Sequence, residues 1–332
     1  MPHALQTVIA AGAATAATTA LALCLAWQPP LRAAETARNR EEYSSSASSP
    51  SSQPRRGQTL RLTLAPARSQ PRAIVLPKSL AELQKTAGEA YLCAQRGNFL
   101  VAGDLGPAEY EYLVDGVLEY CAAALTTVFF DREPVPGKIV NILIFKDYDS
   151  YETGLRRFLD MDPISPYGHY GHSQKYIVVN YETGPGTMVH ELTHALMSED
   201  FPEAPIWLAE GMASLYEHCR AEGDILRGDD NWRLPELKAA LETDSLTPLT
   251  ALLAMPPSVF RGHRESLNYA QARYFCKYLE EMGLLPAMYK GFRNRFGQDP
   301  TGARFIAQAF GKPLEAVETS WKRWIAFQHW KE

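Results

Sequence analysis

The residues in this chain best suited to chemistry are His190, Glu191 and His194, which stand together in the run HELTHAL. In a helix, side chains four residues apart share one face, with Cβ atoms about 5–6 Å apart, so the two imidazoles can bind one ion. Glu191 projects beside that face, where its carboxylate can take a proton from an attacking water. The spacing therefore predicts a metal site with Glu191 as the catalytic base.

A third ligand is available in the next apolar segment, WLAEGMASLYE. Glu210 follows His194 after fifteen residues, which is enough for a turn and the start of a second helix. Gly211 permits close approach between helices. A catalytic zinc ion keeps three protein ligands and one open position. We therefore expect His190, His194 and Glu210 to bind one Zn²⁺ per chain.

The alternative interpretation of this motif is a helix whose polar residues are merely solvated. Apolar neighbours argue against it, because they would bury the imidazoles without a partner. These neighbours are Met188, Val189, Leu192, Ala195 and Leu196. Thr187 is a suitable N-cap, and Pro202 lies just past the expected end, so a helix is predicted over 187–199.

The surrounding segments predict an α+β fold. Runs rich in branched apolar residues predict strands at Ile139–Phe145 and Tyr176–Tyr181, and the run NFLVAGD resembles a strand. Apolar residues at helical spacing predict a long amphipathic helix over Pro107–Phe130. Later helices are expected at 187–199, about 205–221, 234–243 and 265–283. Strands early and helices late, without βαβ alternation or a Gly-rich phosphate loop, are typical of α+β proteins.

The chain is expected to have three parts. Residues 1–34 contain the apolar run Val8–Trp27 and resemble a signal peptide, although the absence of Lys or Arg before Val8 leaves an uncleaved anchor as the alternative. Residues 35–72 are rich in Ser, Pro and Gln and predict a disordered linker. Residues 73–332 form the predicted globular domain. Either leader exports it to the periplasm, to the extracellular space or to the outer side of a membrane.

The net charge of the chain limits which partners it can bind. A net charge of -5 without a basic face predicts no nucleic-acid binding and no electrostatic attachment to a membrane. Membrane contact is expected only through an uncleaved N-terminal anchor.

Four cysteines follow the leader, and a disulfide among them and separate buried thiols both remain open. They are Cys93, Cys121, Cys219 and Cys276.

HELTHAL followed by WLAEGMASLYE resembles the peptidase MA-like branch of the gluzincin metallopeptidases, a group that includes uncharacterised exported bacterial proteins. The likeness runs from about Phe99 to Phe327 and includes IVVN, LNYAQARYFCKYLEE and FGKPLEAVETSWKRWIAF. It implies a thermolysin-like catalytic domain with a small N-terminal mixed sheet, a metal-binding helix and a mostly helical C-terminal half. It also implies His190, His194 and Glu210 as zinc ligands, Glu191 as the base, and a peptide or protein as substrate.

The sequence departs from this family at Ser214, where thermolysin-like relatives have an Asp that orients a ligand histidine. Glu217, two helical turns after Glu210, is a candidate for the missing support, and the alternative is that it faces solvent. Tyr269 is the candidate that stabilises the oxyanion, by resemblance, and its alternative role is packing. His263 is the competing candidate for the same role.

Two further features concern the substrate cleft. The strand Ile177–Asn180 is expected to offer its edge to an extended substrate backbone. His169 and His172, in the run YGHYGH, are expected to line the cleft, since a flexible loop gives no fixed spacing for a second metal site. The prediction is thus a zinc peptidase, and its rivals are a non-catalytic envelope binding protein and a zinc hydrolase of non-peptide amides.

Overall fold

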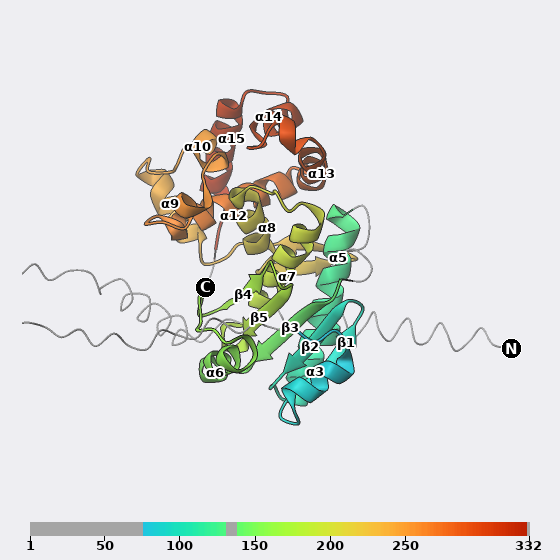
Figure 1. Ribbon diagram of the computed structural model, residues 1–332. Helices are drawn as coiled ribbons and strands as arrows, with labels where there is room; N and C mark the ends of the chain where they lie inside the picture. Colours follow the sequence, from blue (N-terminus) through green and yellow to red (C-terminus); the bar gives the residue numbers. More distant parts are fainter. Residues whose placement is uncertain (1–75, 131–137, 331–332) are drawn as a thin grey trace, which may run out of the picture.

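The computed structural model of the protein describes residues 76–130 and 138–330 (Figure 1). The predicted leader and linker lie outside these residues. The described chain has a mixed α+β fold, as the sequence predicts. In Figure 1 a sheet fills the lower part and the later helices, orange to red, fill the upper part. Between them lie α7 (Pro185–Asp200) and α8 (Ile206–Tyr216).

The sheet has five strands. In spatial order they are β1 (Leu92–Arg96), β2 (Phe99–Gly103), β3 (Val140–Phe145), β5 (Tyr176–Asn180) and β4 (Gly168–Gly171). The three central strands are parallel, and β1 and β4 pair antiparallel at the two ends. The strands predicted from NFLVAGD, Ile139–Phe145 and Tyr176–Tyr181 are confirmed as β2, β3 and β5.

Helical segments connect the parallel strands, so the predicted absence of βαβ alternation is wrong. A long helical segment lies between β2 and β3, and α6 (Tyr148–Leu159) lies between β3 and β5. The buried stripe of α6 is narrow, with Tyr151, Leu155 and Leu159 among mostly polar residues. Their spacing of four residues is the pattern of an amphipathic helix, and the prediction overlooked it.

The sheet separates two apolar layers, and β3 shows how one strand serves both. Ile142 and Ile144 belong to the large core that contains α7 and the later helices. Leu143 and Phe145 belong to the smaller core formed with α3 (Leu80–Ala87) and α6. All six residues of β3 are buried because both faces of the strand are covered, and five of them are apolar. The sixth, Asn141, donates from Nδ2 to the carbonyl oxygen of Pro77 at 3.1 Å.

The long helix predicted over Pro107–Phe130 is present and contains an irregular centre. It consists of α4 (Pro107–Glu111), the π-helix η1 (Tyr112–Leu118) and α5 (Glu119–Phe129). By length and hydropathy it is the one helix of the described residues that could cross a membrane. Leu113, Val114 and Val117 are nevertheless fully buried in the large core. Packing within the domain therefore accounts for its composition.

The C-terminal half is mostly helical, as predicted. It contains α9 (Leu234–Glu242), α10 (Leu249–Leu253), α11 (Pro257–Phe260), α12 (Glu265–Glu281), α13 (Leu285–Arg295), α14 (Ala303–Phe310) and α15 (Leu314–Phe327). One prediction here is wrong, since the helix expected over 205–221 ends at Tyr216. A hairpin follows, β6 (Cys219–Glu222) and β7 (Ile225–Gly228), whose turn contains Gly223 at φ +63°. Glycine adopts this left-handed conformation without strain.

Close packing of α8 on α12 depends on Gly211. A Cβ at this position would lie 2.7 Å from Cys276 Sγ and 2.8 Å from the carbonyl oxygen of Ala272. The expected role of Gly211, to let the two helices approach closely, is therefore confirmed.

All four cysteines of the described chain are outside disulfides, and Cys121 and Cys276 are buried. The alternative of separate buried thiols holds for these two, whereas Cys93 and Cys219 are only partly buried.

Candidate metal centre

The helix α7 carries the HELTH motif, and its start differs from the prediction. Gly184, at φ +100°, is the N-cap and Pro185 is the first helical residue, so the predicted N-cap at Thr187 is wrong. Proline suits a first helical position because the amide that it lacks would have no helical partner there. The Thr187 hydroxyl instead lies 2.9 Å from the hydroxyl of Thr183.

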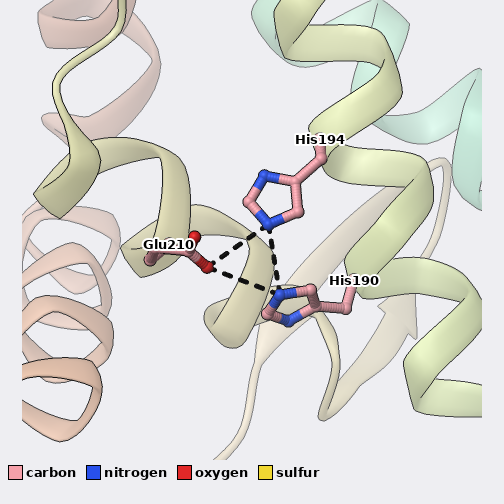
Figure 2. A group of neighbouring side chains, drawn as sticks. All are labelled: His190, His194 and Glu210. Atoms are coloured by element: carbon pink, nitrogen blue, oxygen red, sulfur yellow. Dashed lines mark hydrogen bonds and ion pairs between the residues drawn. The ribbon is translucent and has the colours of Figure 1, made fainter. Parts of the chain in front are cut away.

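His190, His194 and Glu210 converge on one point, as Figure 2 shows. The Nε2 atoms of the two imidazoles are 3.2 Å apart. Glu210 Oε2 lies 3.6 Å from His190 Nε2 and 3.3 Å from His194 Nε2. The three predicted ligands are thus brought together by α7 and α8.

These separations fit a zinc ion. Tetrahedral zinc with bonds of about 2.0–2.1 Å places neighbouring ligand atoms about 3.3–3.4 Å apart. The three distances observed lie on both sides of that value. Glu210 Oε2 is also buried and lacks a well-formed hydrogen bond within the described residues, although both imidazoles are near it. A cation bound between the three side chains would satisfy this oxygen.

The charges at the site are strongly coupled. Burial alone would raise the pKa of Glu210, but the adjacent imidazoles outweigh it and hold that pKa well below its usual range. Burial also acts to lower the pKa of His190, yet its interactions with the carboxylates of Glu210 and Glu217 raise it to about 10. Without a metal, His190 therefore keeps a proton at neutral pH, which a metal ion must displace.

The predicted base, Glu191, is buried beside the ligands, with 7 % of its surface exposed. Burial raises its pKa, and the neighbouring imidazoles of His190 and His194 oppose part of that increase. A backbone hydrogen bond from Tyr170 in β4 also reaches its carboxylate. A carboxyl group with a raised pKa is better able both to accept and to return a proton near neutral pH.

The sheet edge nearest the site is β4, and the prediction of an exposed edge at Ile177–Asn180 is wrong. β5 is paired on both sides, with β3 and with β4. The run YGHYGH, expected to be a flexible loop, instead forms the end strand. Gly168 allows this pairing, because a Cβ there would overlap the carbonyl oxygen of Val178.

The two histidines of that run have separate surroundings. His169 Nε2 lies 3.2 Å from the hydroxyl of Tyr176, in the smaller core, and burial lowers its pKa to about 4. Burial lowers the pKa of His172, and the charges of His194 and Glu210 also act on it. Of the two, only His172 therefore lies near the candidate metal centre, and whether it lines a cleft stays a prediction.

Glu217 supports a ligand histidine, and its alternative role as a solvent-facing residue is wrong. Its Oε2 lies 3.1 Å from His190 Nδ1, and only 12 % of its side chain is exposed. Ser214 is fully buried, and its hydroxyl makes no hydrogen bond within the described residues. A carboxylate at Nδ1 fixes the ring and directs Nε2 toward His194 and Glu210.

This contact requires α7 to start very close to the end of α8. Gly186 lies one turn before His190, and a Cβ there would overlap the carbonyl oxygen of Glu217. A larger residue would separate the two helices where Glu217 reaches the imidazole. Gly186 thus determines the distance between a ligand and its support.

Tyr269, at the start of α12, lies beside the ligand Glu210. Burial raises the pKa of its hydroxyl, and the Glu210 carboxylate raises it further, so the hydroxyl remains a hydrogen-bond donor. Its ring packs on Phe260, with centroids 5.2 Å apart. His263 is exposed, and its side chain has no contact with the ligands among those found in the described chain. The structure thus brings Tyr269, and not His263, to the centre.

Two arginines near the site have no counterpart in the sequence prediction. Arg261 Nη2 lies 2.6 Å from Glu210 Oε1, which leaves Oε2 directed at the histidines. Arg233 Nη2 lies 3.1 Å from Glu217 Oε1. Neither residue belongs to a local motif, and each reaches the centre through tertiary packing alone. The sequence gives no spacing signal for such contacts.

No protein-family model matches this chain, and no curated protein sequence matches it. The assignment of the centre therefore rests on its own geometry.

Proposed function

We propose that this protein is a zinc-dependent hydrolase of peptide bonds with a gluzincin-like catalytic domain. The observation that carries the proposal is a set of three ligand atoms at 3.2, 3.3 and 3.6 Å, next to a buried carboxylate on the same helix. Structural zinc sites are usually closed by four side chains, whereas three leave one position open for a reactant. The donor set thus favours catalysis over a structural role.

His190, His194 and Glu210 would bind the ion, with Glu217 and Arg261 fixing two of these side chains. Zn²⁺ bound there would supply Lewis acidity toward a carbonyl oxygen and would lower the pKa of water. Glu210 adds a negative charge to the two neutral imidazoles that binding requires.

Glu191 would move the proton. Its carboxylate takes one from the attacking water and later gives it to the departing amine nitrogen. An ordinary glutamate, with a pKa of about 4.3, holds a proton poorly at neutral pH. The raised pKa of Glu191 therefore supports both transfers.

Tyr269 would stabilise negative charge on the carbonyl oxygen of the scissile bond. Its hydroxyl stays protonated beside Glu210 and can donate a hydrogen bond as that charge develops. The ring is held by Phe260 on one side, so the hydroxyl is positioned before substrate arrives.

A peptide is the substrate class that the sheet edge supports. β4 is the end strand, and the backbone of its Tyr170 contacts the Glu191 carboxylate. An extended peptide that paired with β4 would pass directly beside the base. We also propose that the domain acts outside the cytoplasm, on the basis of the apolar run Val8–Trp27.

The test is a peptide-library digest by the zinc-loaded protein and by Glu191→Gln. The variant keeps the side-chain shape and removes the proton acceptor, so zinc content should be unchanged while cleavage falls about 10²–10⁴-fold. Equal cleavage by both proteins would disprove the role of Glu191. Zinc binding with no cleavage of any peptide by the wild type would contradict peptidase activity, and a parallel panel of non-peptide amides would then test the other hydrolase.

A further inference from the structure

The residues behind His190 form a connected set that extends from the metal ligand to the opposite wall of the site. Glu217 uses its two oxygens separately, with Oε2 at 3.1 Å from His190 Nδ1 and Oε1 at 3.1 Å from Arg233 Nη2. The contact at Oε1 is an ion pair without hydrogen-bond geometry, so Arg233 restrains the carboxylate by its charge, whereas His190 restrains it by a hydrogen bond. The position of Glu217 is thus determined by Arg233 as well as by its own helix.

Arg233 also contacts the residue proposed to stabilise the oxyanion. Its guanidinium carbon lies 5.6 Å from the centre of the Tyr269 ring and 5.3 Å from that of Trp232. Both distances are within the range of cation–π attraction. Only 20 % of the Arg233 side chain is exposed, so its ion pair with Glu217 is poorly screened by solvent. Arg233 therefore lies between the carboxylate that orients His190 and the ring of Tyr269.

The segment that carries Arg233 is itself anchored to α12. The buried Arg273 donates from Nη2 to the carbonyl oxygen of Asp229 at 2.6 Å. The Asn231 amide donates to the Tyr274 hydroxyl at 3.0 Å, and the Arg233 amide donates to Asn231 Oδ1 at 3.1 Å. These contacts fix the backbone before Arg233 and restrict where its side chain can reach.

We propose that Arg233 is a positioning residue for the metal centre. It acts on His190 through Glu217, and on Tyr269 through its cation–π contact. This inference rests on the proposed metal site and adds a residue that binds neither metal nor substrate. Removing the guanidinium takes away the cation paired with Oε1 and leaves only the more distant charge of Arg273, so Glu217 no longer holds the imidazole in one orientation. Loss of such outer partners lowers metal affinity about 10–100-fold.

The experiment measures zinc affinity by chelator competition and the visible absorption of the Co²⁺-loaded protein. It compares the wild type with Arg233→Met, Arg233→Lys, Glu217→Gln and the double variant of Arg233→Met with Glu217→Gln. Arg227→Met is the matched control, because Arg227 forms an exposed ion pair with Glu222 on the nearby hairpin. Its affinity and spectrum should equal those of the wild type.

Arg233→Met should weaken zinc binding about 10–100-fold and alter the Co²⁺ spectrum. Arg233→Lys keeps a cation for Glu217 and should recover most of the affinity. In the Glu217→Gln background, Arg233→Met should cost little more, since both changes break the same connection. This coupling separates positioning from a general loss of stability.

The proposal would be overturned by wild-type affinity in Arg233→Met, or by losses in the double variant that simply add. If Arg233→Met fails to fold, Arg233→Gln, which keeps a polar side chain and removes the cation, replaces it in the same cycle. A wild type that binds no zinc would instead defeat the proposed function. The two failures are therefore distinguishable.

Discussion

The two walls of the metal centre are built in different ways. The wall formed by α7 and α8 takes all its ligands from one short stretch of chain, His190 to Glu210. The opposite wall takes Arg233 from the N-cap of α9 and takes Arg261 and Tyr269 from the end of α11 and the start of α12, and these side chains meet Glu217 and Glu210 only in the folded domain. The identity of the ligands is thus a local property of the sequence, whereas their orientation is a property of the tertiary structure.

The largest test of this division is to remove a ligand from the local wall. His194→Ala and Glu210→Ala should each lose most of the bound zinc, because two remaining protein ligands hold the ion weakly. Metal analysis of the purified variants, after dialysis against a weak chelator, measures the loss. Full retention of zinc in both variants would show that the ion lies elsewhere.

Tyr269→Phe tests the opposite wall and should have a smaller effect. The change removes one hydroxyl and keeps the ring that contacts Phe260 and Arg233. If the hydroxyl donates to the oxyanion, kcat should fall about 10²-fold while zinc content and Tm stay nearly constant. The control is His263→Ala, which should leave kcat unchanged. A normal kcat for Tyr269→Phe combined with a large loss in His263→Ala would exchange their roles.

The smallest effect concerns the pH dependence of zinc binding by the local wall, where His190 lies beside the carboxylates of Glu191, Glu210 and Glu217. In the metal-free protein the pKa of His190 is about 10, above the ordinary value of about 6.5, so zinc must displace a proton throughout this interval. Zinc affinity should therefore rise with pH, by up to about tenfold per unit between pH 6.5 and 8. Calorimetric titration in buffers of different ionisation enthalpy should detect about one proton released. Affinity independent of pH, with no proton release, would contradict the ion pairs drawn around His190.

The same division explains which parts of the structure could be predicted from the sequence. The spacing of His190, Glu191 and His194 is a direct consequence of helical geometry, and the three main strands have a clear composition. Strand β4 could not be predicted from composition, because its Gly- and Tyr-rich run forms a strand only by pairing with β5. Arg261 reaches Glu210 from 51 residues along the chain, and Arg233 reaches Glu217 across the hairpin of β6 and β7, whose start the sequence predicts as helix, so neither contact has a spacing rule.

Gly186 has a consequence for how relatives of this protein can be recognised. A homologue in which the two helices approach as closely as here needs a glycine one turn before the first histidine and another at the position of Gly211. It also needs a carboxylate at the position of Glu217. The signature of this arrangement is G-x3-H-E-x2-H-x15-E-G-x5-E, longer and far rarer by chance than the histidine motif alone. Database searches with this pattern would separate chains that share the supporting architecture from those that share only the metal ligands, and drift at the glycines would identify branches in which His190 has found a different partner.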